Sequence, residues 1–211
     1  MQTIVANGMG QRSGIWRHSP TSRMVPMDLL AISGSLRLDS SNTALLRAIM
    51  ALAPADLRVT LYADLAGLPP FDPGLEPEAA PDPVQAFRDQ VRAADGVIIC
   101  TPEYAHGMPG ILKNALEWTV ASGEFVDKPV AALSSSPTTS GGEKALAWLT
   151  QTLAVMSAHI VQDVSKPIPF GRSRVRSDGE IVDPALALTL QSVLDGLASA
   201  VEARAQSGSR P

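Results

Sequence analysis

Short apolar segments alternate with amphipathic segments along most of this chain. Continuous apolar runs at 29–32, 96–100 and 129–134 have the pattern of strands buried on both faces, and 57–62 alternates as a half-buried strand does. A further short strand opens at His159. Between these segments, the spacing of apolar residues and the capping signals predict helices, at 43–53, 84–94, 109–121, 143–156 and 184–204.

Strands that alternate with helices predict a parallel sheet, because the chain returns to the same edge through each helix. We therefore predict an α/β fold, a three-layer sandwich with a five-stranded parallel sheet in the order 2-1-3-4-5 and helices on both faces. Ligands of such sheets bind beyond the carboxyl ends of the strands. The loops to examine follow the first, third and fourth strands.

The two ends of the chain lack this pattern. Residues 1–27 hold Arg12, Arg17 and Arg23, no acidic residue and no helical or strand period, which predicts a flexible N-terminal extension. We expect one domain over residues 28–203 and a frayed tail over 204–211.

Composition narrows the class of protein. Of 211 residues, 45% are hydrophobic, and the net charge of -4 argues against a generally basic nucleic-acid binder, although a local basic site is compatible with it. The single cysteine, Cys100, excludes a disulfide framework and a multi-cysteine zinc site, and it fits a reducing cytoplasmic location. No uninterrupted apolar run approaches the roughly 20 residues of a membrane span.

The first loop carries hydroxyls, an arginine and an amide just before a helix. Ser35, Arg37, Ser41, Asn42 and Thr43 lie there, with Ser41 or Asn42 as the predicted helix cap. A helix start offers free N–H groups and positive partial charge, so these residues suit a phosphate monoester. The alternative interpretation is a capped turn with solvated serines. The Walker pattern is absent, which argues against a nucleoside triphosphate.

The second loop, 101–110, is stiffened by two prolines and two glycines. Tyr104 has the shape to lie against a flat ring, and Glu103 can fix the loop by accepting from backbone amides. For His106, a partly exposed loop side chain is the favoured interpretation, and an acid/base role is the alternative. Cys100, at the end of a buried strand, is expected to be a packed thiol.

The third loop, 134–142, consists of small and polar residues, which let a planar ligand pass over exposed backbone; a flexible polar linker is the alternative. No nucleophile-elbow pattern surrounds its serines, which argues against a serine hydrolase. His18, His106 and His159 are scattered, and no metal-ligand spacing is present.

These motifs together resemble those of the NADPH-dependent FMN reductase family. Residues 34–42 resemble its phosphate loop, Gly-Ser-x-Arg-x-x-Ser-x-Asn, and Thr101-Pro102-Glu103-Tyr104 with 109–118 resembles its second motif. The resemblance covers about residues 28–203. It implies a flavodoxin-like fold, bound FMN, NADPH or NADH as co-substrate, and a quinone, flavin, azo dye or metal oxyanion as acceptor.

The resemblance also assigns roles to residues. Ser35, Arg37, Ser41, Asn42 and Thr43 are expected to hold the phosphate of FMN. The ring is expected to lie among residues of the other two loops, which are Pro102, Glu103, Tyr104, Ala105, His106, Ser134, Gly141 and Gly142. Family members often carry Asn after the Tyr, where this chain has Ala105, so His106 is the candidate to supply a missing polar contact.

The implied reaction is hydride transfer from a nicotinamide to the flavin, followed by electron transfer to the acceptor in a ping-pong sequence. No catalytic acid or base is required, because the cofactor carries the chemistry. The family further implies a homodimer or a dimer of dimers, and the proline-rich stretch 69–83 is a candidate to cover a neighbouring subunit's flavin. A flavodoxin-type electron carrier with a protein partner and a module without cofactor are the rival hypotheses.

Overall fold

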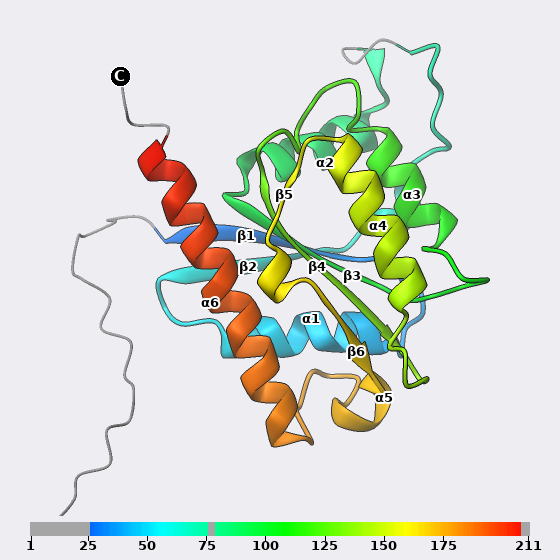
Figure 1. The fold of residues 1–211 in the computed structure, drawn as a ribbon. Coiled ribbons are helices and arrows are strands. Elements are labelled where there is room, and N and C mark those ends of the chain that lie inside the picture. The colour runs from blue at the N-terminus through cyan, green and yellow to red at the C-terminus, as the bar shows by residue number, and fades with distance from the viewer. Residues whose placement is uncertain (1–25, 76–78, 208–211) are drawn as a thin grey trace, which may run out of the picture.

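The computed structural model describes residues 26–75 and 79–207, in which a parallel sheet lies between two layers of helices (Figure 1). The strands are β1 (Met27–Ser33), β2 (Leu57–Tyr62), β3 (Gly96–Thr101), β4 (Pro129–Ser136), β5 (His159–Ile160) and β6 (Lys166–Pro169). The helices are α1 (Ser41–Leu52), α2 (Asp82–Ala93), α3 (Gly110–Glu117), α4 (Glu143–Val155), α5 (Gly171–Arg174) and α6 (Pro184–Ser207), with short 3-10 turns η1 (Leu65–Gly67) and η3 (Gln162–Val164).

The sheet has the predicted order β2-β1-β3-β4-β5, and all its pairings are parallel. Because all pairings are parallel, β1, β3 and β4 end at one edge, where Ser33 pairs with Cys100 and Thr101 with Ser134. The flavodoxin-like fold class is thus confirmed, and the edge that holds the site is the expected one.

The strand count was wrong, because the outermost strand is divided. β5 has two residues and pairs with the start of β4; after η3, β6 pairs with the end of β4, from Leu133 with Lys166 to Ser136 with Pro169. No strand was predicted at Lys166–Pro169, where Pro167 and Pro169 cannot donate ladder hydrogen bonds. Such prolines are tolerated on an edge strand, which is the place that β6 occupies.

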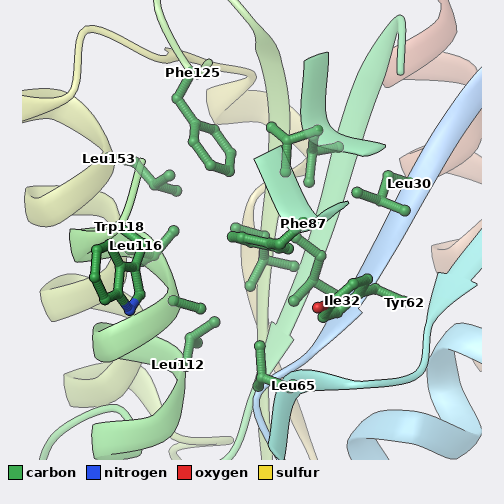
Figure 2. Close-up of a cluster of buried hydrophobic side chains, with 14 of the residues drawn as sticks. Leu30, Ile32, Tyr62, Leu65, Phe87, Leu112, Leu116, Trp118, Phe125 and Leu153 are labelled. Carbon is green, nitrogen blue, oxygen red and sulfur yellow. The ribbon is translucent and has the colours of Figure 1, made fainter. Parts of the chain in front are cut away.

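Alternate residues of the central strands enter two separate cores. Leu30, Ile32, Val97 and Ile99 face α2, α3 and α4, whereas their neighbours in sequence face α1 and α6. Figure 2 shows the first core, with Phe87 among the strand and helix side chains. Its ring centroid lies 4.9 Å from that of Tyr62. Burial on both faces explains why the central strands read as continuous apolar runs.

Several helix and strand boundaries differ from the predicted ones. The cap of α1 is Ser40, whose hydroxyl accepts from the N–H of Thr43, and neither Ser41 nor Asn42 is the cap. α3 ends at Glu117 instead of near residue 121, and turns follow. Met27, placed in the predicted extension, belongs to β1, and α6 continues to Ser207. Residues 1–25 and 208–211 lie outside the described residues, so a flexible extension stays a prediction.

The proline-rich connection after β2 is fastened to α3 at its start. The amide of Asn114 donates to the carbonyl of Pro69 and accepts from the N–H of Phe71, at 2.9 and 2.7 Å. The indole N–H of Trp118 donates to the same Pro69 carbonyl, and its ring meets Phe71 edge-on. Asn114 and Trp118, both in the second motif, therefore hold this connection in place.

α6 is long and apolar enough, by length and composition alone, to cross a membrane. Polar residues interrupt its apolar ones, so it contains no uninterrupted apolar run of that length. However, its buried residues pack on the sheet beside α1 as part of the second core; they are Leu186, Leu190, Val193, Leu194, Leu197 and Val201. A core helix of a globular domain accounts for its composition.

Asn114→Ala is expected to loosen the proline-rich connection. The substitution removes two hydrogen bonds to partly buried backbone groups, so we expect a loss of about 1–3 kcal/mol in the free energy of unfolding. Urea denaturation and limited proteolysis between residues 68 and 75 measure it. The control is Lys113→Ala, which breaks a partly exposed ion pair with Glu117 and is expected to cost under about 1 kcal/mol. Equal stability and protease resistance of the two variants would contradict the assignment.

Candidate functional site

Four chain segments meet at the carboxyl edge of the sheet. They follow β1, β3, β4 and β6, and they lead into α1, α3, α4 and α5 respectively. Between them lies a cavity of about 560 Å³, measured out to its open mouth. It is lined by Ser35, Arg37, Asp39, Ser40, Ser41, Asn42, Pro102, Glu103, Tyr104, Ser135, Ser136, Pro137 and Arg172.

The predicted residues divide into two groups. The structure brings together, around the cavity, Ser35, Arg37, Ser41, Asn42, Pro102, Glu103 and Tyr104. The remaining predicted residues support the loops and are not among its lining residues; they are Thr43, Ala105, His106, Ser134, Gly141 and Gly142. Both groups lie at one edge, so the three loops form one site.

The loop after β1 supplies hydroxyls at the start of α1. The Ser35 hydroxyl accepts from the N–H of Arg37 at 3.3 Å, which holds the turn in shape. Ser40 caps the helix, and Ser41 is its first residue. The positive partial charge of the α1 N-terminus therefore lies at the cavity, and the Arg37 side chain adds a full positive charge there.

Asn42 and Thr43 also serve the protein itself. The buried amide of Asn42 accepts from the Cys100 thiol at 3.1 Å and donates to the Ser135 carbonyl at 3.3 Å. The Thr43 hydroxyl shares a hydrogen bond with that of Ser33 at 2.8 Å. These side chains tie the loops to the sheet. Burial raises the pKa of Cys100 above its usual value, so this residue is the packed, protonated thiol that the sequence predicted.

The loop after β4 turns sharply at the carboxyl edge of the sheet. Ser134 is fully buried, and its hydroxyl donates to the Gly141 carbonyl at 2.9 Å. Gly141 and Gly142 both have positive φ, and a Cβ on Gly141 would lie 2.8 Å from the nitrogen of Pro169. Glycine is therefore required for the approach of this loop to β6, and Ser134, Gly141 and Gly142 fix the course of the loop.

Glu103 caps a helix that has no cap of its own. Gly142 precedes α4 and offers no side chain, and Glu103 Oε2 accepts from the N–H groups of Lys144 and Ala145, at 3.0 and 3.2 Å. Partial burial alone would raise the pKa of this carboxyl, but hydrogen bonds from Ala145, His106 and Lys144 outweigh it. The net pKa lies below the usual value. Glu103 thus fixes the second loop to the third, as its amide-bonding interpretation predicted.

The turn beyond Glu103 is a tight hairpin. Tyr104 and Gly107 exchange both backbone hydrogen bonds at 3.0 Å, and Ala105 and His106 between them have φ of 49° and 64°. Both central residues at positive φ define a type I′ turn, which favours Asn-Gly. Where family members often carry Asn, this chain therefore has an alanine, Ala105, in the left-handed conformation. The imidazole of His106 is exposed and lies 3.4 Å from the Glu103 carboxylate.

The residues missed by sequence reasoning come from two sources. Ser135 and Ser136 line the cavity because β4 runs two residues beyond its predicted end, and Pro137 follows directly after it. Asp39 and Ser40 lay unassigned within the first loop. Arg172 belongs to the short α5 after β6. No local motif marks it, because its position depends on the pairing of β6 with β4.

A second cavity of about 550 Å³ lies near the amino ends of β1 and β2. Its lining includes the carboxylates of Asp56, Asp195 and Glu202. These negative charges would repel a phosphate, so this cavity does not suit a phosphorylated cofactor.

Comparison with known proteins agrees with this architecture. Residues 27–171 match the family model described as NADPH-dependent FMN reductase. The chain belongs to this family. An NAD(P)H-dependent FMN reductase of Pseudomonas aeruginosa is 34% identical over 171 residues, which cover 80% of this chain and 92% of the relative. A 2-hydroxy-1,4-benzoquinone reductase of a Burkholderia species is 33% identical over 181 residues, or 84% and 98% of the two chains.

The solved structures agree as well. FerB, a flavoenzyme NAD(P)H:(acceptor) oxidoreductase from Paracoccus denitrificans, superposes with a TM-score of 0.75 at 29% identity, over 83% of this chain and 97% of that chain. The predicted family is confirmed, and with it an oxidoreductase that uses FMN and a nicotinamide nucleotide. This result favours the enzyme over the electron-carrier and cofactor-free alternatives.

Glu103→Ala is expected to destabilise the fold by about 0.5–2 kcal/mol, because α4 loses its cap. Glu103→Gln keeps a neutral acceptor and serves as the matched control for charge. The folded-state pKa of Glu103 lies below the unfolded value of about 4.3. Its charge therefore stabilises the protein above that pH, and the benefit disappears as pH falls through the folded-state pKa.

Denaturant unfolding of the wild type and Glu103→Gln between pH 7 and pH 3 measures this dependence. We expect the wild type to be more stable at neutral pH and the difference to vanish toward the acidic end. A difference that is constant or that grows on acidification would contradict the capping role.

Proposed function

We propose that the cavity binds FMN and that the chain passes reducing equivalents from NADPH or NADH, through this flavin, to a small acceptor. The observation that supports the proposal is the cavity itself, one end of which suits a phosphate group and the other a flat ring. The named relatives include an FMN reductase and a benzoquinone reductase. Quinones are therefore the first acceptors to test, and free flavin, azo dyes and metal oxyanions are the others.

The first end of the cavity fits a phosphate monoester. Ser35 and Ser41 offer hydroxyls beside the N-terminus of α1, and the Arg37 guanidinium has no hydrogen-bond or ion-pair partner within residues 26–75 and 79–207. A dianionic phosphate placed here would receive charge-assisted hydrogen bonds. Asn42 and Thr43, which bond to the protein, act by holding the loop.

The second end fits a flat ring. Pro102, Glu103 and Tyr104 line it on one side, and Ser136 and Pro137 line it from the loop after β4. The Tyr104 ring is half exposed, so its face is accessible to a planar ligand. We assign Ala105, His106, Ser134, Gly141 and Gly142 to the support of these walls, at the turn and beneath the third loop.

Bound FMN would supply the redox chemistry, a two-electron exchange first with the nicotinamide and then with the acceptor, with protons drawn from solvent. The protein binds and orients the flavin, and none of its residues is required as a catalytic acid or base. Glu103, the carboxylate nearest the ring end, is engaged by two backbone amides and ionised at neutral pH, so it stores no proton for the reaction. The open mouth lets nicotinamide and acceptor bind in turn, which supports ping-pong kinetics.

A homodimer or a dimer of dimers is part of the proposal. Apolar side chains are exposed along one face of α4 and the turns after α3, with Trp148, Val155 and Val120 all more than half exposed. The face lies beside the site, because the Trp148 ring lies within 3.3 Å of a Cβ built on Gly107. Contiguous exposed apolar surface is typical of subunit contacts. We also propose a cytoplasmic location, with which a single buried cysteine is compatible.

Anaerobic half-reactions test the function. Protein reconstituted with FMN and mixed with NADPH or NADH without oxygen is expected to lose the oxidised-flavin absorbance in proportion to the nucleotide. Addition of a quinone is expected to restore it, with one quinone consumed per flavin. A flavin that stays oxidised with both nucleotides would contradict the proposal, as would steady-state kinetics whose double-reciprocal lines intersect.

Val155→Glu tests the dimer. Val155 is 80% exposed, so the substitution leaves the core intact, whereas burial of a charge between two subunits is costly. We expect sedimentation velocity to show dimers or tetramers for the wild type and a shift to smaller species for the variant. Leu188→Glu, at a similarly exposed site on α6, is the control and is expected to assemble normally. A wild-type monomer, or an unshifted variant, would contradict the proposed contact.

A further inference from the structure

Besides Arg37, a second arginine lines the cavity, and it lies outside the family motifs. Arg172 lies on α5, and its side chain lines the same cavity as Arg37, Ser40 and Ser41. Arg37 and Arg172 are far apart in sequence and lie on different loops. The parallel pairing of β6 with β4 brings them to one cavity.

The backbone beneath Arg172 is fixed by close packing. The N–H of Phe170 donates to the Ser136 carbonyl at 3.0 Å, which joins the start of α5 to the end of β4. A Cβ on Gly171 would clash with the Ser135 hydroxyl, and that hydroxyl donates to the Ile168 carbonyl at 2.9 Å. Arg172 therefore projects from an anchored segment, although its own side chain is exposed.

Neighbouring arginines are engaged by the protein, but Arg172 is not. Arg174 pairs with Asp183 at 2.7 Å and Arg176 with Glu180. Arg47 donates to the Ser177 carbonyl. Over the described residues, 26–75 and 79–207, the Arg172 guanidinium has neither a hydrogen bond nor an ion pair. The side chain is thus available to a ligand, as that of Arg37 is.

We infer that Arg172 is a second ligand of the phosphate, which it approaches from α5 while Arg37 approaches from the loop after β1. The inference rests on the proposed binding of FMN and deepens it. Two guanidinium groups match the double negative charge of a phosphate monoester, and they outweigh the single carboxylate at this end, Asp39. The pair selects for a phosphorylated flavin over the uncharged riboflavin.

A polar groove that continues beyond this point supplies the control. It shares Asp39, Ser40, Ser41 and Arg172 with the cavity and extends to Arg176 and Ser177. Arg176 lines the groove but not the cavity, and it is ion-paired and exposed. Loss of an arginine at 176 therefore changes the charge of the same region without touching the proposed phosphate position.

The test measures flavin fluorescence on titration of the apoprotein with FMN and with riboflavin. For Arg172→Gln we expect the Kd for FMN to rise by roughly tenfold or more, because a charge-assisted hydrogen bond is lost, with no change in the Kd for riboflavin. The salt dependence of FMN binding is expected to become shallower. Arg176→Gln is expected to bind both ligands as the wild type does, and thermal unfolding verifies that each variant folds.

Arg37→Ala separates this inference from the proposed function. If Arg37→Ala weakens FMN binding and Arg172→Gln does not, the proposed site stands and the inference is overturned. Equal weakening of FMN and riboflavin by Arg172→Gln would also overturn it, because that pattern indicates a structural effect. A wild-type protein that binds neither flavin would refute the proposed function itself, and an Arg37→Ala variant that retains FMN through dialysis would refute the assignment of Arg37 to the phosphate.

Discussion

The buried amide of Asn42 fastens together the elements on which the site depends. It belongs to α1, and it bonds to Cys100 at the end of β3 and to the Ser135 carbonyl near the end of β4. The N-terminus of α1 is thereby held against two strands far away in sequence. Because both amide atoms are engaged and the residue is 2% exposed, this bridge is costly to break. The positions of the phosphate-facing hydroxyls follow from it.

The other loops are joined in a similar way, by polar side chains that bond across the carboxyl edge. Glu103 links the loop after β3 to the start of α4, and Ser135 links β4 to β6. The glycines at 141 and 142 allow the close approach that these bonds require. The cavity walls thus come from loops that a parallel sheet brings together and that a few hydrogen bonds hold in register.

Most of the fold was predictable because strands buried on both faces leave continuous apolar runs, and the helices between them leave a period of 3.6. β6 was missed because its two prolines remove the usual strand signal, and a sequence pattern does not show that the strand lies at an edge. α3 was predicted too long because the apolar residues after Glu117 pack through turns, with Phe125 buried in the core.

The site was predictable as a set of loops but not in the role of each side chain. A serine or asparagine in a motif faces either a ligand or the protein, and composition does not decide which. Asn42, Thr43 and Ser134 bond inward, whereas Ser35 and Ser41 line the cavity. No local sequence signal marks Arg172, because its position depends on the pairing of β6 with β4, whose paired residues are more than 30 positions apart in sequence.

A crystal structure of the protein reconstituted with FMN tests the central claim most directly. We expect electron density for the phosphate between the Arg37 and Arg172 side chains, at the N-terminus of α1, and for the ring against Pro102 and Tyr104. Density for FMN in the second cavity, near the amino ends of β1 and β2, or with its phosphate away from the loop after β1, would contradict the proposed site.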